Sequence, residues 1–261
     1  MKAAFVTGAA GDIGRAICAA FLSNGLTVAG VDINEEGLYA TAAELAAGDR
    51  FLPIQADVTR MDSVLAAVQR VNGVLGDVGI LVNNAGGISA PSLMTTEEHH
   101  WLRDIELNLN GPWRCIRALQ EQLVRTGTRA APSVIVNIAS VNGLGVFGHP
   151  GYSAAKAGLI HLTRFCAVEF GRHAVRSIAI CPGSVKTRAW KERRQVKPEI
   201  LEEVAGWYPS RDTCTPQDVA ALVAMTVTGP FTLMNGAVIT LDGGLTAGSD
   251  RLASSFAGVP L

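Results

Sequence analysis

The sequence predicts an α/β fold in which helices cover both faces of a doubly wound parallel sheet, giving three layers in a single domain. Three observations lead to this prediction. Short apolar runs alternate along the whole chain with segments of helical spacing, and glycine is frequent where the two kinds of segment meet. The 261 residues, 48% of them hydrophobic, are enough for one large core.

Seven apolar runs have the character of strands buried on both faces, because their apolar residues are continuous rather than alternating. A parallel sheet covered by helices requires such strands, whereas a half-exposed antiparallel strand alternates. The expected strands are residues 3–6, 27–31, 51–54, 80–82, 133–138, 176–180 and 237–241.

Between these strands lie segments whose apolar residues recur at helical spacing. The expected helices are residues 13–24, 35–47, 61–75 and 153–171. One long interruption, residues 186–216, precedes a late helix. A segment of that length in a compact domain is more typical of a functional lid than of a linker. We therefore predict one domain, residues 1–261, with a substrate loop at 186–216.

Charge and cysteine usage exclude several classes of partner. A net charge of −1 gives no electrostatic reason to expect nucleic acid or an anionic membrane surface. No segment approaches the ~20 continuous apolar residues of a membrane helix, and the N-terminus lacks the pattern of a signal peptide. We expect a cytoplasmic protein without a metal site, whose five separated cysteines are reduced thiols: Cys18, Cys115, Cys166, Cys181 and Cys214.

The segment Thr7-Gly8-Ala9-Ala10-Gly11-Asp12-Ile13-Gly14 follows the first expected strand and opens the first expected helix. Glycine allows a sharp turn and the close approach of a phosphate group, and the helix N-terminus offers free N–H groups to the phosphate charge. This context favours a Rossmann-type dinucleotide site over the alternative, a tight turn without a ligand.

Asp32 ends the second expected strand and discriminates between the two nicotinamide dinucleotides. A carboxylate there accepts hydrogen bonds from both hydroxyls of the adenosine ribose and repels a 2′-phosphate. The glycine-rich segment itself supplies no cation that would offset this repulsion. We therefore predict NAD rather than NADP as the cofactor.

The segment Tyr152-Ser153-Ala154-Ala155-Lys156 places a phenol and an ammonium group one helical turn apart. A cation beside a tyrosine stabilises the phenolate and lowers its pKa, as a general base requires. The motif alone is also common in surface pairs. Ser140 strengthens the interpretation as a catalytic site, because it ends an expected strand at the sheet edge where such folds bind ligands.

With these residues in place, the chain resembles the short-chain dehydrogenase/reductase family over essentially its whole length. The matching motifs occur in the family's order and at nearly its spacing. They are residues 7–14, Asp57-Val58, Asn83-Asn84-Ala85-Gly86, Ser140, Tyr152-x-x-x-Lys156, Pro182-Gly183 and Leu241-Asp242-Gly243-Gly244.

The resemblance implies a catalytic role for four side chains. Tyr152 corresponds to the family's acid/base, and Lys156 to the lysine that binds the nicotinamide ribose and tunes the tyrosine. Ser140 corresponds to the serine that hydrogen-bonds the substrate oxygen. Asn108 corresponds to the asparagine that anchors a proton-relay water at a break in a helix, with Asn110 as the second candidate.

The resemblance also implies a set of cofactor-binding residues. Asp12 departs from the family pattern, which usually has glycine there, and we expect its side chain to point away from the pyrophosphate or to cap the following helix. The expected contacts of NAD are Gly8, Gly11, Asp12, Ile13, Gly14, Asp32, Ile33, Asp57, Val58, Asn84, Ala85, Gly86, Tyr152, Lys156, Pro182, Gly183, Val185 and Thr187.

The sequence says least about the substrate. Aromatic side chains near the site suit a largely apolar, cyclic or aryl compound, although each could equally pack the substrate loop onto the domain. The expected lining residues are Val141, Asn142, Phe147, Ser184, Trp190 and Trp207, with His149 and Tyr208 as weaker candidates.

We therefore expect an NAD(H)-dependent oxidoreductase that interconverts a secondary alcohol and a ketone. A 3-oxoacyl thioester reductase is an alternative, but the family's reductases of that kind usually prefer NADP and need a basic patch for an acidic carrier. A sugar or polyol dehydrogenase is another alternative, which a more polar loop would favour. A cofactor-sensing protein without activity would not need the intact Ser140, Tyr152 and Lys156.

The family commonly forms tetramers, so a homotetramer is expected. The last six residues are rich in apolar groups, whereas a frayed terminus is usually polar. The apolar residues of this tail are Phe256, Val259, Pro260 and Leu261. Either the tail covers a neighbouring subunit, as an isologous contact allows, or it folds back on its own subunit.

Overall fold

In a computed structural model of the chain, seven parallel strands form one sheet in the order β3-β2-β1-β4-β5-β6-β7. The structure describes residues 2–188, 190 and 195–259. The strand order reverses beside β1, which lies between β2 and β4, and open sheets bind ligands at such a reversal. The strands are β1 (Ala3–Thr7), β2 (Thr27–Asp32), β3 (Phe51–Gln55), β4 (Val78–Asn83), β5 (Ser133–Ile138), β6 (Val175–Pro182) and β7 (Val238–Leu241).

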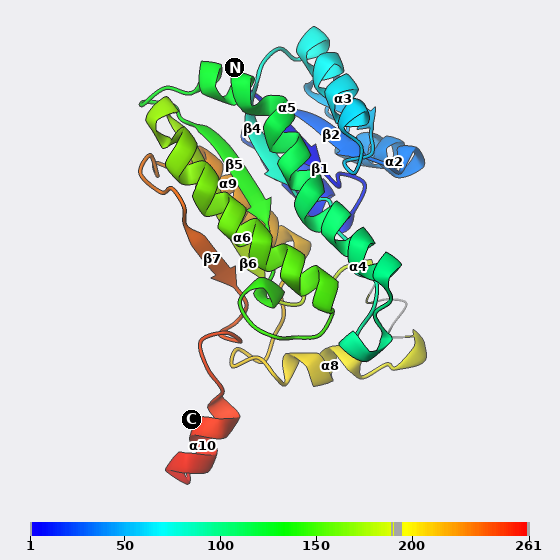
Figure 1. The fold of residues 1–261 in the computed structure, drawn as a ribbon, viewed down its shortest axis with the longest axis vertical. Coiled ribbons are helices and arrows are strands. Elements are labelled where there is room, and N and C mark those ends of the chain that lie inside the picture. The colour runs from blue at the N-terminus through cyan, green and yellow to red at the C-terminus, as the bar shows by residue number, and fades with distance from the viewer. Residues whose placement is uncertain (1, 189, 191–194, 260–261) are drawn as a thin grey trace.

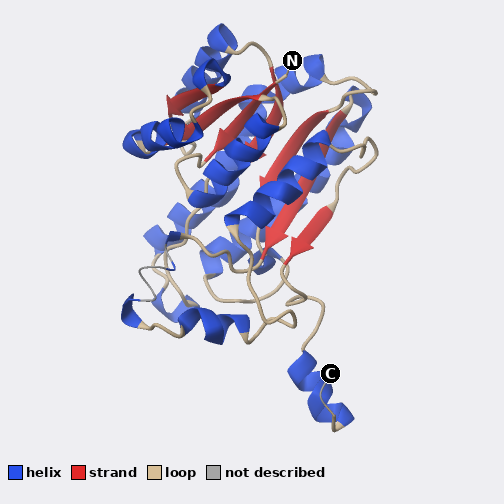
Figure 2. Ribbon diagram, turned by 180° about the vertical axis from the view of Figure 1, so that it is seen from behind, coloured by secondary structure: helices blue, strands red, loops and turns tan. Residues whose placement is uncertain are grey.

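Helices cover both faces of the sheet, so the predicted three-layer α/β fold is confirmed (Figures 1 and 2). Successive strand residues point to opposite faces, and Val6 and Phe5 accordingly belong to different halves of the core. One face packs against α1 (Asp12–Ser23), α2 (Glu35–Leu45) and α9 (Pro216–Thr228). The other packs against α3 (Met61–Val74), α5 (Gly111–Thr126) and α6 (Pro150–Phe170).

The seven expected strands are all present, and the expected helix boundaries are shifted by at most three residues. Helix α6 begins at Pro150 rather than at residue 153, because proline fits the first turn of a helix, where no N–H is needed. The sequence analysis missed α4 (Glu98–Ile105) and the π-helical turn Glu106–Asn110, which run directly into α5. It also missed the short helices α8 (Ile200–Ala205) and α10 (Asp250–Ala257).

The segment 186–216 closes on itself at its base. The backbone N–H of Lys186 donates to the carbonyl of Cys214 at 2.8 Å, and the N–H of Cys214 donates to the carbonyl of Ser184 at 3.1 Å. Helix α8 lies within this segment, beyond the carboxyl ends of the strands (Figure 1). Within the described ranges, no helix is both long enough and apolar enough to cross a membrane.

Candidate active site

The glycine-rich loop between β1 and α1 forms a cradle that only glycine permits. Gly8 has a φ of +69°, and a Cβ there would lie 2.7 Å from the Asn84 side-chain nitrogen. A Cβ on Gly14 would lie 2.0 Å from the carbonyl oxygen of Gly8. The N-cap of α1 is Gly11, which has no side chain to bind the N–H groups of the first turn. The cradle therefore fits the pyrophosphate of a dinucleotide.

The opposite wall of the cradle is fixed by hydrogen bonds to Thr7. The N–H groups of Asn84 and Ala85 both donate to the Thr7 hydroxyl at 3.0 Å. The Asn84 side chain donates to the carbonyls of Thr7 at 2.9 Å and Gly8 at 3.2 Å. These bonds hold residues 84–86 against the glycine-rich loop, on the side where the sequence analysis expected the cofactor wall.

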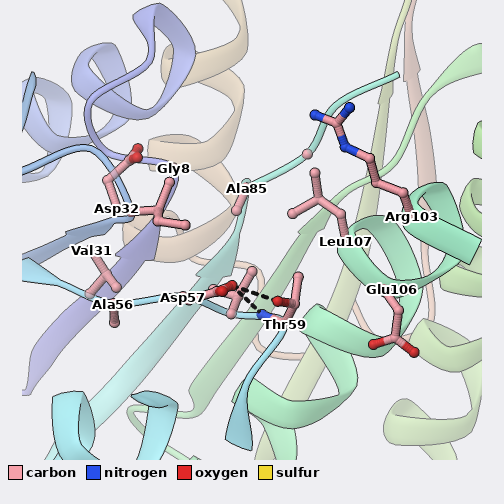
Figure 3. Close-up of a pocket in the computed structure, with 13 residues that line it drawn as sticks. Gly8, Val31, Asp32, Ala56, Asp57, Thr59, Ala85, Arg103, Glu106 and Leu107 are labelled. Atoms are coloured by element: carbon pink, nitrogen blue, oxygen red, sulfur yellow. Dashed lines mark hydrogen bonds between the residues drawn. The ribbon is translucent and has the colours of Figure 1, made fainter. Parts of the chain in front are cut away.

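A hollow of about 580 Å³ lies at the outer end of the cradle and contains both carboxylates expected near adenosine (Figure 3). Asp32 accepts from the N–H groups of Ala10 and Asn34, each at 3.0 Å, so both of its oxygens are oriented. Asp57 accepts from the N–H and hydroxyl of Thr59 at 2.8 and 2.7 Å. The rest of the lining includes the expected Ile33, Val58, Ala85 and Gly86, and the unexpected Arg103, Glu106 and Leu107.

At the inner end of the cradle, a hollow of about 230 Å³ brings Ser140, Tyr152 and Lys156 together. Ser140 follows β5, and the other two lie one turn apart on α6, as their spacing predicts. The Lys156 ammonium donates to the carbonyl of Ile138 at 2.7 Å and lies 5.4 Å from the centre of the Tyr152 ring. The same hollow is lined by the expected Ile13, Asn84, Gly86, Pro182, Gly183 and Val185.

The electrostatics of this pair differ from the expectation that Lys156 lowers the pKa of Tyr152. Burial raises the pKa of Tyr152, and the charges of Cys181 and Asp104 raise it further, while a hydrogen bond from Ser140 lowers it. Burial also lowers the pKa of Lys156 to about 8. The physical cause is the same for both groups: burial removes the side chain from water, which penalises its charged form.

Asn108, rather than Asn110, faces the site. Its side-chain oxygen accepts from the N–H of Gly87 at 3.2 Å, and its side-chain nitrogen donates to the carbonyl of Gly87 at 2.8 Å. A Cβ on Gly86 would lie 2.9 Å from this oxygen and 3.6 Å from the Lys156 ammonium. Asn110 instead donates to Glu106.

The π-helical turn supplies the break that the family's water-binding asparagine needs. In a regular helix, the N–H of residue 112 would donate to the carbonyl of Asn108. Residue 112 is proline, which has no N–H, and the Gly111 N–H donates to the carbonyl of Glu106. The Asn108 carbonyl therefore lacks its regular helical donor.

Asn142, expected to line the substrate site, also holds Ser140. The Ser140 hydroxyl donates to the Asn142 side-chain oxygen at 3.3 Å and accepts from the Asn142 N–H at 3.2 Å. The Asn142 amide donates in turn to the carbonyl of Gly148 and the hydroxyl of Ser153, at 3.0 and 3.1 Å. This network orients the serine before any substrate is present.

The remaining substrate candidates are dispersed. Val141 is buried, Phe147 is exposed, and the N–H of Ser184 donates to the hydroxyl of the buried Tyr208 at 2.7 Å. The N–H of His149 and a nitrogen of its ring are bound to the carbonyls of the 90–91 loop.

Two loop tryptophans lie outside the hollow that contains Tyr152. Trp190 lines a neighbouring hollow of about 550 Å³ together with Lys186. Trp207 is 64% exposed and stacks against the Arg251 guanidinium, which lies 4.4 Å from the centre of its ring.

The side chain of Asp12 does not cap α1, whose N-cap is Gly11. It pairs instead with Arg15 and with Arg188, each at 2.8 Å. Arg188 and the expected Thr187 line a hollow of about 380 Å³ around the glycine-rich loop. Arg188 was not among the residues expected at this site from the sequence. No local pattern indicated it, since Arg188 is 176 positions from Asp12.

Known proteins resemble this chain over nearly its whole length. A family model described as enoyl-(acyl carrier protein) reductase matches residues 8–246. An uncharacterized oxidoreductase of Schizosaccharomyces pombe is 35% identical over 251 residues, which are 96% of this chain and 93% of that protein. The 2-(R)-hydroxypropyl-CoM dehydrogenase of Xanthobacter autotrophicus is 33% identical over 252 residues, which are 94% of this chain and 99% of that protein.

Among solved structures, an oxidoreductase of the short-chain dehydrogenase/reductase family from Burkholderia thailandensis is similar to this chain with a TM-score of 0.90. The two chains are 34% identical, and the similarity covers 98% of this chain and 97% of the other. Both the glycine-rich loop and the hollow with Tyr152 lie inside the region matched by the family model.

Proposed function

This chain belongs to the short-chain dehydrogenase/reductase family, and on that premise we propose that it is an NAD(H)-dependent enzyme interconverting a secondary alcohol and a ketone. One observation carries the proposal: Ser140, Tyr152 and Lys156 meet in one hollow at the inner end of a glycine cradle that fits a pyrophosphate. A protein that only senses the cofactor has no use for a proton-transfer group at that position.

In alcohol oxidation, bound NAD⁺ supplies the acceptor for the hydride that leaves the alcohol carbon. Tyr152, as phenolate, takes the proton of the alcohol oxygen. Ser140, oriented by Asn142, donates a hydrogen bond to the same oxygen. Lys156 lies beside the phenol, and in this proposal the Asn108 carbonyl, which lacks its regular helical donor, accepts from a water through which the proton leaves. Ketone reduction reverses each transfer.

Asp32 supports NAD as the cofactor. Its two oxygens are held by the N–H groups of Ala10 and Asn34 at the rim of the adenosine hollow, where a ribose with two free hydroxyls fits. We expect Asp32→Ala to weaken NAD binding and to improve NADP relative to it, because the ribose acceptor and the repulsion disappear together. The ratio of kcat/KM for the two cofactors measures this change. A wild-type enzyme that already prefers NADP would contradict our interpretation of Asp32.

The enzyme's substrate is proposed to be largely apolar or cyclic. Ile13, Ile88 and Val185 line the hollow around Tyr152, and the exposed Phe147 lies on the loop between Ser140 and α6. Apolar surface at a site with only a few polar groups favours a substrate whose single polar atom is the reacting oxygen.

The proposed acid/base is tested by removing one oxygen atom. Tyr152→Phe keeps the ring, so folding and NAD binding should survive while turnover of the best secondary alcohol falls by at least ~10²-fold. NADH formation across a set of small apolar, cyclic and polyol alcohols identifies that substrate, and titration of NAD checks the binding. Retention of more than about a tenth of wild-type turnover would remove Tyr152 from the proton-transfer role.

We also propose a homotetramer in the cytoplasm. Five free cysteines, four of them buried, suit a reducing compartment. Helix α10 projects beyond the carboxyl ends of the strands, and Phe256 on it is 84% exposed (Figures 1 and 2). Its contacts with its own subunit include an ion pair of Asp250 with Arg211, a hydrogen bond from Arg251 to the carbonyl of Gly206 at 2.8 Å, and the stacking of Arg251 on Trp207. Its apolar side is thus available to a neighbour, although Pro260 and Leu261 lie outside the described residues.

A further inference from the structure

The glycine-rich loop carries a carboxylate at a position where anionic phosphate is expected to bind. The side chain of Asp12 is only 12% exposed, so its charge is weakly screened by solvent. Two arginine side chains neutralise the carboxylate of Asp12. Arg15 approaches from the next turn of α1, and Arg188 approaches from the start of the segment 186–216.

Arg188 is tied to Asp12 through two separate groups. Its backbone N–H donates to one carboxylate oxygen at 2.6 Å, and its Nε lies 2.8 Å from the other. The ion pair therefore fixes the backbone at the entrance of the segment 186–216 as well as the guanidinium. A single carboxylate thereby connects the glycine-rich loop to the loop on the substrate side of the cofactor site.

The guanidinium also reaches across the glycine-rich loop. Its Nη2 donates to the carbonyl of Ala10 at 3.1 Å, and the N–H of the same Ala10 donates to Asp32. Arg188 lines the hollow of about 380 Å³ that contains Gly8, Gly11 and Gly14. Its bonds to other described residues use the backbone N–H, Nε and Nη2, which leaves Nη1 for another acceptor. The side chain is 59% exposed, so this donor is accessible.

We propose that Asp12 and Arg188 form a latch that holds residues 186–188 against the glycine-rich loop, and that Arg188 binds the pyrophosphate of the dinucleotide. This proposal rests on the proposed use of NAD. Arg188 is a second cationic group for the phosphate charge in addition to the N–H groups of α1, and it offsets the repulsion from Asp12. Arg15, which pairs with both Asp12 and Glu44, does not line the hollow around the glycine-rich loop.

If Arg188 binds the pyrophosphate, its removal should weaken ligands that carry a phosphate and leave adenosine unaffected, whereas a residue that only packs the loop would affect both alike. Arg188→Ala should weaken ADP-ribose and ADP by ~10-fold or more, because a charge-assisted contact is lost and Asp12 loses a partner. Adenosine, which has no phosphate, should bind the variant and the wild type alike. The double variant Asp12→Asn/Arg188→Ala should bind ADP tighter than Arg188→Ala does, because the repulsive carboxylate is gone. These affinities are measured by calorimetry, or by NMR titration for adenosine.

Arg15→Ala is the matched control, since it removes the other cation from Asp12 without reaching the phosphate hollow. We expect its ADP affinity to stay within ~3-fold of wild type, because Arg188 still pairs with Asp12 and still lines the hollow around the glycine-rich loop. Higher salt should weaken ADP binding to the wild type more steeply than to Arg188→Ala. Circular dichroism verifies that each variant is folded.

Three outcomes would overturn the assignment. Equal losses for adenosine and ADP would make Arg188 a packing residue, and an unchanged ADP affinity would remove it from the phosphate site. Selective loss of 2′,5′-ADP, which carries a 2′-phosphate but no pyrophosphate, would assign Arg188 to that phosphate instead. If the wild type binds neither ADP nor NAD, the proposed function itself fails; if it binds both and Arg188→Ala does too, only the latch fails.

Discussion

Replacing Lys156 with methionine should make the protein's stability respond differently to pH. Lys156 is 4% exposed, and burial lowers its pKa from 10.5 to about 8. That difference corresponds to ~3 kcal/mol of penalty against the charged form in the folded protein. Methionine has a similar length and no charge, so Lys156→Met removes this penalty. It also removes the hydrogen bond to the carbonyl of Ile138, whose loss costs about the same at every pH.

The direction of this pH dependence follows from the number of protons that the folded and the unfolded chain bind. Between pH 8 and 10.5 the unfolded chain holds a proton on Lys156 that the folded chain has released, so the wild type becomes more stable relative to the variant as pH rises through this window. Between about pH 7 and 9.5 the relative gain is ~2 kcal/mol. The variant should thus have its largest advantage near neutral pH, where the lysine would be needed for catalysis.

Urea unfolding at the two pH values measures this difference. Both proteins should carry Tyr152→Phe, because burial also raises the pKa of that phenol and its titration would otherwise add to the signal. Titrations elsewhere in the chain are common to both proteins and cancel. A difference in unfolding free energy that stays constant between the two pH values, within ~0.5 kcal/mol, would refute the lowered pKa of Lys156.

Two other predictions concern the cradle and the tail. Gly14→Ala places a Cβ 2.0 Å from the carbonyl oxygen of Gly8, so it should reduce the free energy of unfolding by ~1–3 kcal/mol and impair NAD binding. Gly73→Ala, in the last turn of α3 with no atom within 4 Å of the new Cβ, is the control and should be neutral or stabilising in thermal unfolding. Ending the chain after Gly244 should dissociate the tetramer in sedimentation experiments; an unchanged tetramer would exclude the tail from the interface.

The elements that the sequence predicted well depend on short-range patterns. A strand buried on both faces shows a continuous apolar run wherever it lies, and all five residues of β1 are buried as that run indicates. The i, i+4 spacing of Tyr152 and Lys156 fixes their relation as soon as α6 forms. Ser140 lies in the same hollow as this pair because it follows the end of β5. The family resemblance added the roles of these residues, which the patterns alone left open.

The helical run through α4 escaped prediction because it is short and mostly polar. Five of its eight residues are charged or histidine, and its three apolar residues, Trp101, Leu102 and Ile105, form too short a stripe to mark a helix on their own. Pro112 was the available signal for the break that follows, since a proline near the start of α5 removes a helical donor four residues earlier. That signal selects Asn108 over Asn110, a choice that spacing alone left open.

The placement of the loop aromatics could not be derived from sequence either. Trp207 stacks against Arg251 and Tyr208 binds Ser184, contacts that join residues 24 to 44 positions apart through a segment without a repeating pattern. Aromatic residues in such a segment are equally suited to packing and to substrate contact. Tyr208 is committed to packing against the backbone of Gly183, while Phe147 stays exposed near Ser140.

At Asp12 the chain departs from the family's glycine-rich motif, and an arginine far away in the sequence neutralises the added charge. Asp12 stands where the family usually has glycine, and a carboxylate directed at the pyrophosphate would repel it. Arg188 neutralises Asp12 and not Asp32, whose oxygens bind the backbone N–H groups of Ala10 and Asn34. The cation thus supports pyrophosphate binding without cancelling the charge that disfavours a 2′-phosphate. On this proposal, removing Arg188 alone leaves the carboxylate of Asp12 without one of its two cationic partners beside the phosphate site, so Arg188→Ala weakens the cofactor site more than the double variant Asp12→Asn/Arg188→Ala does.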